Sequence, residues 1–278
     1  MPGPIVVCVI NLKGGVGKST ITALLARRAA LSRAKKVLTI DLDPQANLSQ
    51  ALMGRAYADF LKNQDPSIVE LFKGVLPPNK QGGAPSAISD GIAKDIFNFG
   101  GKYLKIIPSR FDFSDNLTTA VRPDPLVLAR YLSAHYSDAD LVLIDCAPTE
   151  SILTMAAYHA SRYVLVPVKP EYFATIGFPL LQESLTTFRR ANRGNSIDVA
   201  GVVVNNGFYH GGNDGGPEKV RAMDEIRREA AKNSWHIFAN QIPYSRGFPK
   251  IMRGDDSYSG NAIMFPRFAD EFFTQIGL

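Results

Sequence analysis

A glycine-rich stretch that ends in Lys-Ser-Thr carries the most specific chemical signal in the sequence. It follows the apolar residues 5–10 and reads Asn11-Leu12-Lys13-Gly14-Gly15-Val16-Gly17-Lys18-Ser19-Thr20. Glycines let backbone N–H groups approach phosphate oxygens, a lysine neutralises their charge, and a serine hydroxyl can ligate Mg²⁺. Because an apolar run precedes this stretch and a helical pattern begins at Lys18, the sequence predicts a loop that binds the phosphates of a nucleotide.

This loop departs from the standard phosphate-binding pattern at its start. The standard pattern has a glycine where this chain has Leu12, and the chain instead carries a second lysine, Lys13, directly before Gly14. Lys18 already occupies the position that neutralises the β- and γ-phosphates. Lys13 is therefore either a solvated loop residue or a cation with a separate task.

Carboxylates follow two further apolar runs. Asp41 and Asp43 come after residues 37–40, and strand alternation places them on the same side. Asp145 directly follows the run Leu141–Ile144. Ligands bind at the carboxyl ends of parallel strands, and Mg²⁺ prefers oxygen ligands while keeping several waters. We therefore expect these carboxylates and the Ser19 hydroxyl to meet at one nucleotide site.

Alternating apolar runs and helical patterns must position these residues. Continuous apolar runs are typical of strands that helices cover on both faces, and strand–helix repetition predicts a parallel sheet. The sequence thus predicts a three-layer α/β fold with a mostly parallel, twisted sheet and helices on both faces. The expected strands are Ile5–Ile10, Val37–Ile40, Leu104–Ile107, Leu141–Ile144, Tyr163–Val168, Val199–Val204 and Ile237–Ile242. The expected helices are Lys18–Arg33, Pro125–His135, Ile152–Ala160, Ile176–Arg190 and Pro217–Lys232, with irregular segments at Leu76–Ser89 and Gly207–Gly216.

The composition excludes several classes of protein. The 278 residues are 45% hydrophobic and 21% charged, which suits a folded protein with a sizeable core. No apolar run approaches the roughly 20 residues that span a bilayer, and no secretory signal is recognisable. The only two cysteines, Cys8 and Cys146, lie in apolar runs, so we expect packing roles in a reducing cytoplasm, without a disulfide scaffold or a four-cysteine metal site.

The positive charge is unevenly distributed. The net charge is +5, and the stretch from Arg189 to Arg253 holds 11 Lys and Arg against 6 Asp and Glu, which accounts for the whole excess. Such a stretch is either a solvated helix surface or a patch that faces a polyanion.

KGGVGKST, followed by DLDPQANLS and LVLIDCAP, resembles the motifs of the ParA/MinD family of deviant Walker A P-loop ATPases. The resemblance implies that Lys13 reaches across a dimer interface to the partner's nucleotide, and that Lys18 binds the phosphates of ATP. It implies that Asp43 orients or activates the attacking water. Mg²⁺ would be bound by Ser19 and Asp145, with Asp41 supporting its water shell, while Asn47 would help to hold the loop.

The resemblance covers nearly the whole chain. It places Asn205 and Asn206 near the adenine and lets Pro243 and Tyr244 border the base. It implies a single ATPase domain over residues 1–278, of the short ParA form without an N-terminal helix-turn-helix domain. The remaining nucleotide contacts would come from the phosphate loop: Lys13, Gly14, Gly15, Val16, Gly17, Lys18, Ser19 and Thr20.

By this resemblance the chain is a ParA-like ATPase, cytoplasmic and nucleoid-associated, that partitions or positions a cargo. ATP would drive a sandwich dimer that binds DNA without sequence preference, and a ParB-like partner would stimulate hydrolysis. The favoured DNA contacts are Arg246, Lys250 and Arg253, with the helices around Arg189–Arg193 and Arg227–Arg228 as alternatives.

The main alternative is a MinD-like membrane-associated positioning ATPase. That class uses a basic amphipathic C-terminal helix. Here the C-terminal residues carry one arginine and two acids, and Phe268, Phe272 and Ile276 share a helical face that we expect to dock on the core. We therefore expect no membrane binding.

Overall fold

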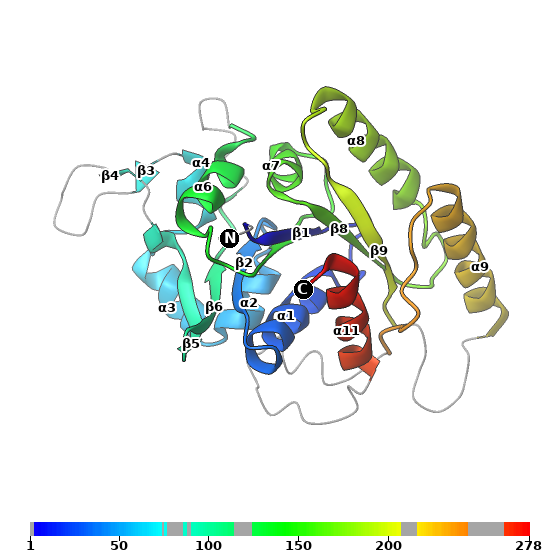
Figure 1. Cartoon of the computed structure of the whole chain (residues 1–278), viewed down its shortest axis with the longest axis horizontal. Coiled ribbons are helices and arrows are strands. Elements are labelled where there is room, and N and C mark those ends of the chain that lie inside the picture. The colour runs from blue at the N-terminus through cyan, green and yellow to red at the C-terminus, as the bar shows by residue number, and fades with distance from the viewer. Residues whose placement is uncertain are drawn as a thin grey trace.

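A seven-stranded, mostly parallel sheet forms the centre of the computed structural model (Figure 1). The structure describes residues 3–73, 75–76, 86–87, 90–113, 124–206, 216–243 and 264–278. The strand order is β5-β6-β2-β7-β1-β8-β9, and only β5 runs antiparallel to its neighbour. The sheet strands are β1 (Ile5–Val9), β2 (Lys36–Asp41), β5 (Lys94–Phe99), β6 (Lys102–Ile107), β7 (Leu141–Asp145), β8 (Tyr163–Val168) and β9 (Asp198–Val204); β3 (Val75–Leu76) and β4 (Ser86–Ala87) pair separately.

Helices cover both faces of the sheet, as the continuous apolar runs predict. In β1, Val6 and Cys8 belong to the core on one face, while Val7 and Val9 belong to the core on the other. Helices α4 (Ile68–Lys73), α6 (Val127–His135), α7 (Ile152–Ala160), α8 (Gly177–Ala191) and α9 (Gly216–Lys232) contribute to the first core. Helices α1 (Lys18–Arg27), α2 (Asn47–Met53) and α11 (Met264–Ile276) contribute to the second. The three-layer α/β prediction is confirmed.

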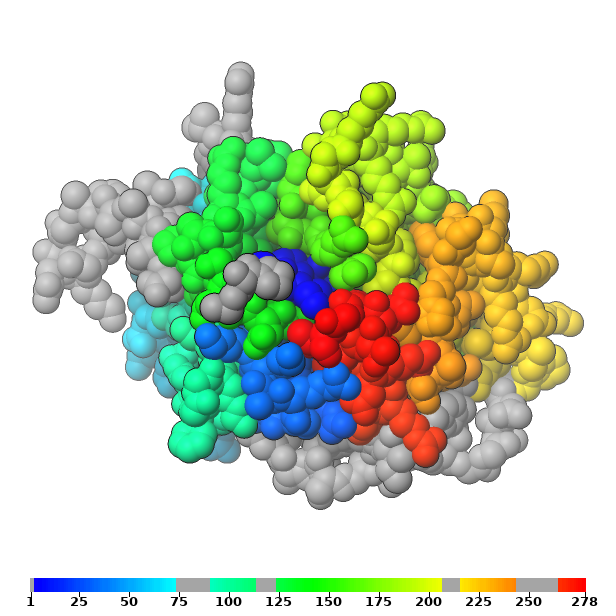
Figure 2. Space-filling view, in the orientation of Figure 1, coloured from blue at the N-terminus to red at the C-terminus, as the bar shows by residue number. Residues whose placement is uncertain are grey.

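The C-terminal helix α11 is part of the core. Phe268 and Phe272 are fully buried and Ile276 nearly so. In the space-filling view the red C-terminal segment lies against blue N-terminal residues and orange residues (Figure 2), and its phenylalanines share a core with α1. The expectation that this apolar face docks on the protein is confirmed. No helix of the described residues is long and apolar enough to cross a membrane.

Some predicted elements differ from the observed ones. Residues 237–242 do not form a full strand; they contact β9 through isolated bridges at Ile237 and Ile242. The edge strand β5 and the helices α2, α3 (Ala56–Asn63) and α4 were not predicted. The first helix is shorter than predicted, since a π-helical turn, Arg28–Ser32, follows α1. Most of the two predicted irregular segments lies outside the described residues.

Candidate active site

The phosphate loop connects β1 to α1 at the carboxyl end of the sheet's central strands. Gly15 and Gly17 adopt positive φ angles of 73° and 95°, which glycine tolerates best. A Cβ on Gly14 or Gly15 would meet nothing within 4 Å, so the backbone there is open to a ligand. No side chain caps the start of α1, whose first amides are therefore free to bind an anion.

Asn11 holds the base of this loop, a role that the sequence reasoning missed. Its buried side-chain amide donates to the carbonyl of Pro167 (2.7 Å) and its Oδ1 accepts from the Lys13 amide (2.9 Å). A Cβ on Gly177, at the start of α8, would lie 2.8 Å from that Oδ1. The available signal was a polar residue two positions after an almost fully buried strand.

Asn205 closes the loop from the other side. Its Nδ2 donates to the Val16 carbonyl at 2.8 Å, and a Cβ on Gly17 would lie 2.2 Å from the same Nδ2. The bridge between Asn205 and Ile242 places Ile242 and the buried Pro243 beside Asn205. The structure thus groups Asn205, Asn206 and Pro243 near the loop, whereas Tyr244 lies outside the described residues; their adenine contacts stay predictions.

Lys18 is buried inside the loop that it is expected to serve. Its Nζ donates to the carbonyls of Asn11 (3.2 Å) and Lys13 (3.4 Å). Burial lowers the pKa of Lys18, while the charges of Asp145 and Asp43 raise it in part. A bound phosphate would supply the anionic partner that this ammonium group needs for a fully charged state.

Two of the three carboxylates are neighbours in the sheet. Asp41 and Asp145 pair in register between β2 and β7, and both are fully buried. Asp41 Oδ2 accepts from the Ser49 amide (2.8 Å) and hydroxyl (2.7 Å), and its Oδ1 accepts from the Asp43 amide (3.1 Å). Neither oxygen of Asp145 accepts a hydrogen bond of normal geometry.

The burial of these carboxylates perturbs their proton affinity. Desolvation raises the pKa of Asp41 to about 7, against the opposing hydrogen bonds from Ser49. Desolvation and then the charge of Asp41 raise the pKa of Asp145 well above its ordinary value, which the Ser19 hydroxyl and Lys18 lower only in part. A cation at this position would favour the ionised form of both.

The residues fit a Mg²⁺ ion held mainly by phosphate, water and few protein atoms. Asp145 offers two buried oxygens without hydrogen-bond partners, and Ser19 lies beside it. Among the residues that the structure describes, no three His, Cys, Asp or Glu side chains form a metal-holding group. One hydroxyl and one carboxylate suffice for a magnesium ion that also binds phosphate.

Lys13 occupies a different environment from Lys18. Its Nζ donates to the Tyr172 carbonyl at 3.3 Å and lies 3.7 Å from a carboxylate oxygen of Glu171, and its side chain is 24% exposed. Glu171 also lies 3.8 Å from Lys169. Lys13 is thus only partly buried, and its ammonium group contacts the segment that follows β8.

The basic residues divide into two groups. The favoured DNA contacts Arg246, Lys250 and Arg253 lie outside the described residues. Of the alternatives, Arg189 binds the Ile197 carbonyl at 2.9 Å and Arg227 pairs with Asp224 at 2.9 Å. Both predicted packing roles for the cysteines are confirmed, since Cys8 and Cys146 are buried.

Comparisons with known proteins agree with this geometry. Residues 5–198 match the family described as AAA domain. The chromosome-partitioning ATPase Soj of Treponema pallidum is 30% identical over 197 residues, which cover 69% of this chain and 68% of Soj.

Two solved structures share the fold at low sequence identity. A variant of McdA from Cyanothece in complex with ATP has a TM-score of 0.72 at 19% identity, over 100% of this chain and 98% of that one. Cobyrinic acid a,c-diamide synthase from Mycobacterium smegmatis, with an ATP analogue and magnesium, has a TM-score of 0.65 at 23% identity, over 96% and 93%. With the phosphate loop, the carboxylates and the second loop lysine in place, this chain belongs to the AAA-domain family and, within it, to the ParA/MinD-type P-loop ATPases.

Proposed function

We propose that this ATPase forms a sandwich dimer when it binds ATP, that the dimer binds DNA without sequence preference, and that hydrolysis releases it. Cycles of binding and release would partition or position a cargo such as a plasmid, a chromosome or a protein assembly, with a ParB-like partner stimulating hydrolysis. The relationship to Soj, a chromosome-partitioning ATPase, supports this proposal.

The placement of the two lysines carries the proposal. Lys18 is buried in its own phosphate loop, whereas Lys13 lies on the surface beside Tyr172. Phosphoryl transfer accumulates charge around the γ-phosphate, and a cation from a second subunit can stabilise that charge only once the dimer has formed. Lys13 is accessible for this task.

An apolar surface next to Lys13 supports the same proposal. Four large apolar residues in and after the segment that contacts Lys13 are more than half exposed: Tyr172, Phe173, Ile176 and Leu180. The rings of Tyr172 and Phe173 contact each other, and exposed apolar groups of this kind are typical of protein–protein contacts. A second copy that receives Lys13 would also cover this surface.

The site residues divide the work of hydrolysis between them. Lys18 and the loop amides would bind the phosphates, Ser19 and Asp145 would hold Mg²⁺, and Asp43 would orient the attacking water. Bound Mg²⁺ supplies charge neutralisation at the phosphates. ATP, an ATP analogue and magnesium are bound in the solved structures that share this fold.

DNA binding by the ATP form is the test that separates this function from the MinD-like alternative. We expect fluorescence anisotropy with duplexes of unrelated sequence to show binding with ATP, weak binding with ADP, and a steep loss with salt. The double variant Arg246→Glu/Arg253→Glu should lose DNA binding but keep ATP-driven dimerisation. Each lost phosphate contact should reduce the log–log salt slope by about 0.9.

The outcome that contradicts the proposal is equally specific. If the wild-type ATP dimer shows no DNA affinity even in low salt, the partition function fails, and flotation with liposomes and ATP becomes the next test. If the dimer binds DNA and the double variant binds equally well, the contacts lie elsewhere, with the Arg189–Arg193 and Arg227–Arg228 helices as the first choices.

A further inference from the structure

The Ser49 hydroxyl lies between Asp41 at the nucleotide site and the backbone that follows the neighbouring strand β6. Ser49 is fully buried in α2, eight residues after Asp41. Its hydroxyl donates to Asp41 Oδ2 (2.7 Å) and accepts from the Ser109 amide (2.9 Å). Because a hydroxyl has one hydrogen to donate, the Asp41 contact uses its whole donor capacity.

Asp41 in turn fixes the start of the turn that carries Asp43. Its Oδ1 accepts from the Asp43 amide at 3.1 Å, and its Oδ2 also accepts from the Ser49 amide. The Asp43 carboxylate accepts from the Gln45 amide at 2.9 Å, and Ala46 follows in a left-handed conformation with φ of 54°. Without the Asp41 contacts, this strained turn would lose the hydrogen bonds that tie both its ends to one carboxylate.

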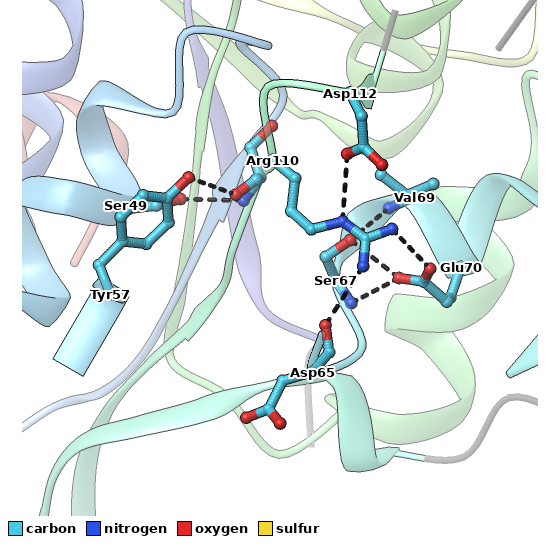
Figure 3. A network of polar contacts seen from close by, with 9 residues as sticks. Ser49, Tyr57, Asp65, Ser67, Val69, Glu70, Arg110 and Asp112 are labelled. Atoms are coloured by element: carbon cyan, nitrogen blue, oxygen red, sulfur yellow. Dashed lines mark hydrogen bonds and ion pairs between the residues drawn. The ribbon is translucent and has the colours of Figure 1, made fainter. Parts of the chain in front are cut away.

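The backbone segment that donates to Ser49 has further hydrogen bonds and an ion pair (Figure 3). Ser109 follows β6, and its carbonyl accepts from the Tyr57 hydroxyl at 3.1 Å. The next residue, Arg110, pairs with the buried Glu70 at 2.9 Å. Glu70 also accepts from the Ser67 amide (2.7 Å) and hydroxyl (2.8 Å). The segment that contacts Ser49 is therefore anchored to α3 and α4.

We propose that Ser49 is a positioning residue of the ATPase: it holds the Asp41 carboxylate, and through it the Asp43 turn, against the anchored backbone of Ser109. The proposal rests on the proposed role of Asp43 in orienting water. It assigns Asp41 mainly to positioning, because its oxygens accept hydrogen bonds from Asp43 in the turn and from Ser49 in α2, whereas the oxygens of Asp145 accept none of normal geometry.

Kinetics of Ser49→Ala test this proposal, with Thr39→Val as the matched control. Thr39 is buried in the same strand as Asp41, and its hydroxyl donates to the Lys105 carbonyl (3.0 Å), away from the carboxylates. Ser49→Ala should lower kcat about tenfold or more, since small displacements of catalytic groups are costly, and leave the KM for ATP within about twofold. Thr39→Val should keep kcat within about twofold. Its melting temperature should fall about as far as that of Ser49→Ala.

A double-mutant cycle shows whether Ser49 acts through Asp41. If it does, Ser49→Ala combined with Asp41→Asn should have the kcat of Asp41→Asn alone, within about twofold. If the double variant instead shows the product of the two single-variant reductions in kcat, the proposal is overturned. A kcat for Ser49→Ala equal to that of Thr39→Val would also overturn it. Should Ser49→Ala not fold, Ser49→Cys keeps the shape and a weaker donor, and wild-type kcat in that variant would also overturn it.

Asp43→Ala, measured in the same series, separates the two proposals. If Asp43→Ala hydrolyses ATP normally, the role of Asp43 fails, and a Ser49 effect cannot be explained through it. If Asp43→Ala is inactive while Ser49→Ala turns over like the control, only the Ser49 proposal is overturned.

Discussion

Replacing Asp145 by Asn should stabilise the protein in the absence of nucleotide and Mg²⁺. Neither oxygen of this fully buried carboxylate accepts a hydrogen bond of normal geometry, and the Ser19 hydroxyl beside it can also donate to an amide oxygen, so the isosteric substitution mainly removes a buried charge. Burial raises the pKa of Asp145 well above 3.8. Above that raised pKa, Asp145 is ionised in both states, but only the unfolded state lets water solvate the charge. At alkaline pH the buried charge therefore lowers the free energy of unfolding.

The sign of the pH dependence follows from the same pKa. Between the unfolded pKa of 3.8 and the raised folded value, the unfolded state has released the proton and the folded state keeps it. The free energy of unfolding therefore falls as the pH rises through that interval, and Asp145→Asn should remove this part of the decline. The Asp41 carboxyl group, with its pKa of about 7, should retain its own decline.

The expected size of the effect is measurable by calorimetry. A buried amide without full pairing keeps the cost of a neutral polar group, about 1–3 kcal/mol, whereas a charged group costs more, and we expect removal of the charge to recover a further amount of about 1–3 kcal/mol. For a chain of this size about 1 kcal/mol corresponds to roughly 2 °C, so the melting temperature at pH 8 in EDTA should rise by about 2–6 °C. Asp145→Asn should also lose most of the additional stabilisation that Mg²⁺ gives to the wild-type protein with ATP. A lower melting temperature than wild type in EDTA, or an unchanged Mg²⁺ effect, would refute this account of Asp145.

Three further substitutions test the rest of the site. Lys18→Ala should weaken ATP binding about a hundredfold, because a buried charged contact to phosphate is lost, and calorimetric titration giving an affinity near wild type would contradict the phosphate-loop assignment. Gly17→Ala should lower the melting temperature and prevent ATP binding, because Gly17 has a φ of 95° and a Cβ there would lie 2.2 Å from Asn205. The control Gly14→Ala has open space around its Cβ and should melt close to wild type. Equal melting temperatures for the two variants would argue against the clash. Asp43→Ala should bind ATP with Mg²⁺ but hydrolyse it about 10²–10⁴-fold more slowly, and a smaller change in single-turnover rate would count against its role.

The sheet and the phosphate site were predictable because strong local patterns encode them. The apolar runs at residues 5–10 and 141–144 are continuous since both faces are covered, which is a sequence-visible consequence of the layered fold. The glycine and lysine spacing of the loop is likewise local. Six of the seven expected strands lie in the sheet within a few residues of their predicted bounds.

The missed features depend on contacts between distant parts of the chain. Asn11 binds Pro167, 156 positions away, and Ser49 binds Ser109, 60 positions away, so neither partnership has a local pattern. The edge strand β5 contains no fully buried residue, and its sequence Lys-Asp-Ile-Phe-Asn-Phe mixes polar and apolar residues, so it has no continuous apolar run. The segment 237–242 looked like a strand because it begins with Ile237-Phe238-Ala239 and ends with Ile242, but it makes only two isolated bridges.

Molar mass in solution with ATP and Mg²⁺ tests the central claim most directly. Light scattering coupled to size-exclusion chromatography should find Asp43→Ala, which retains its ATP, as a dimer of about 60 kDa, twice the 30.3 kDa of one chain. Asp43→Ala with ADP should elute as a monomer, and Asp43→Ala/Lys13→Ala should remain a monomer with ATP while binding it normally. A monomeric Asp43→Ala with ATP, or a dimer that forms equally well without Lys13, would contradict the claim that Lys13 completes the site of a second subunit.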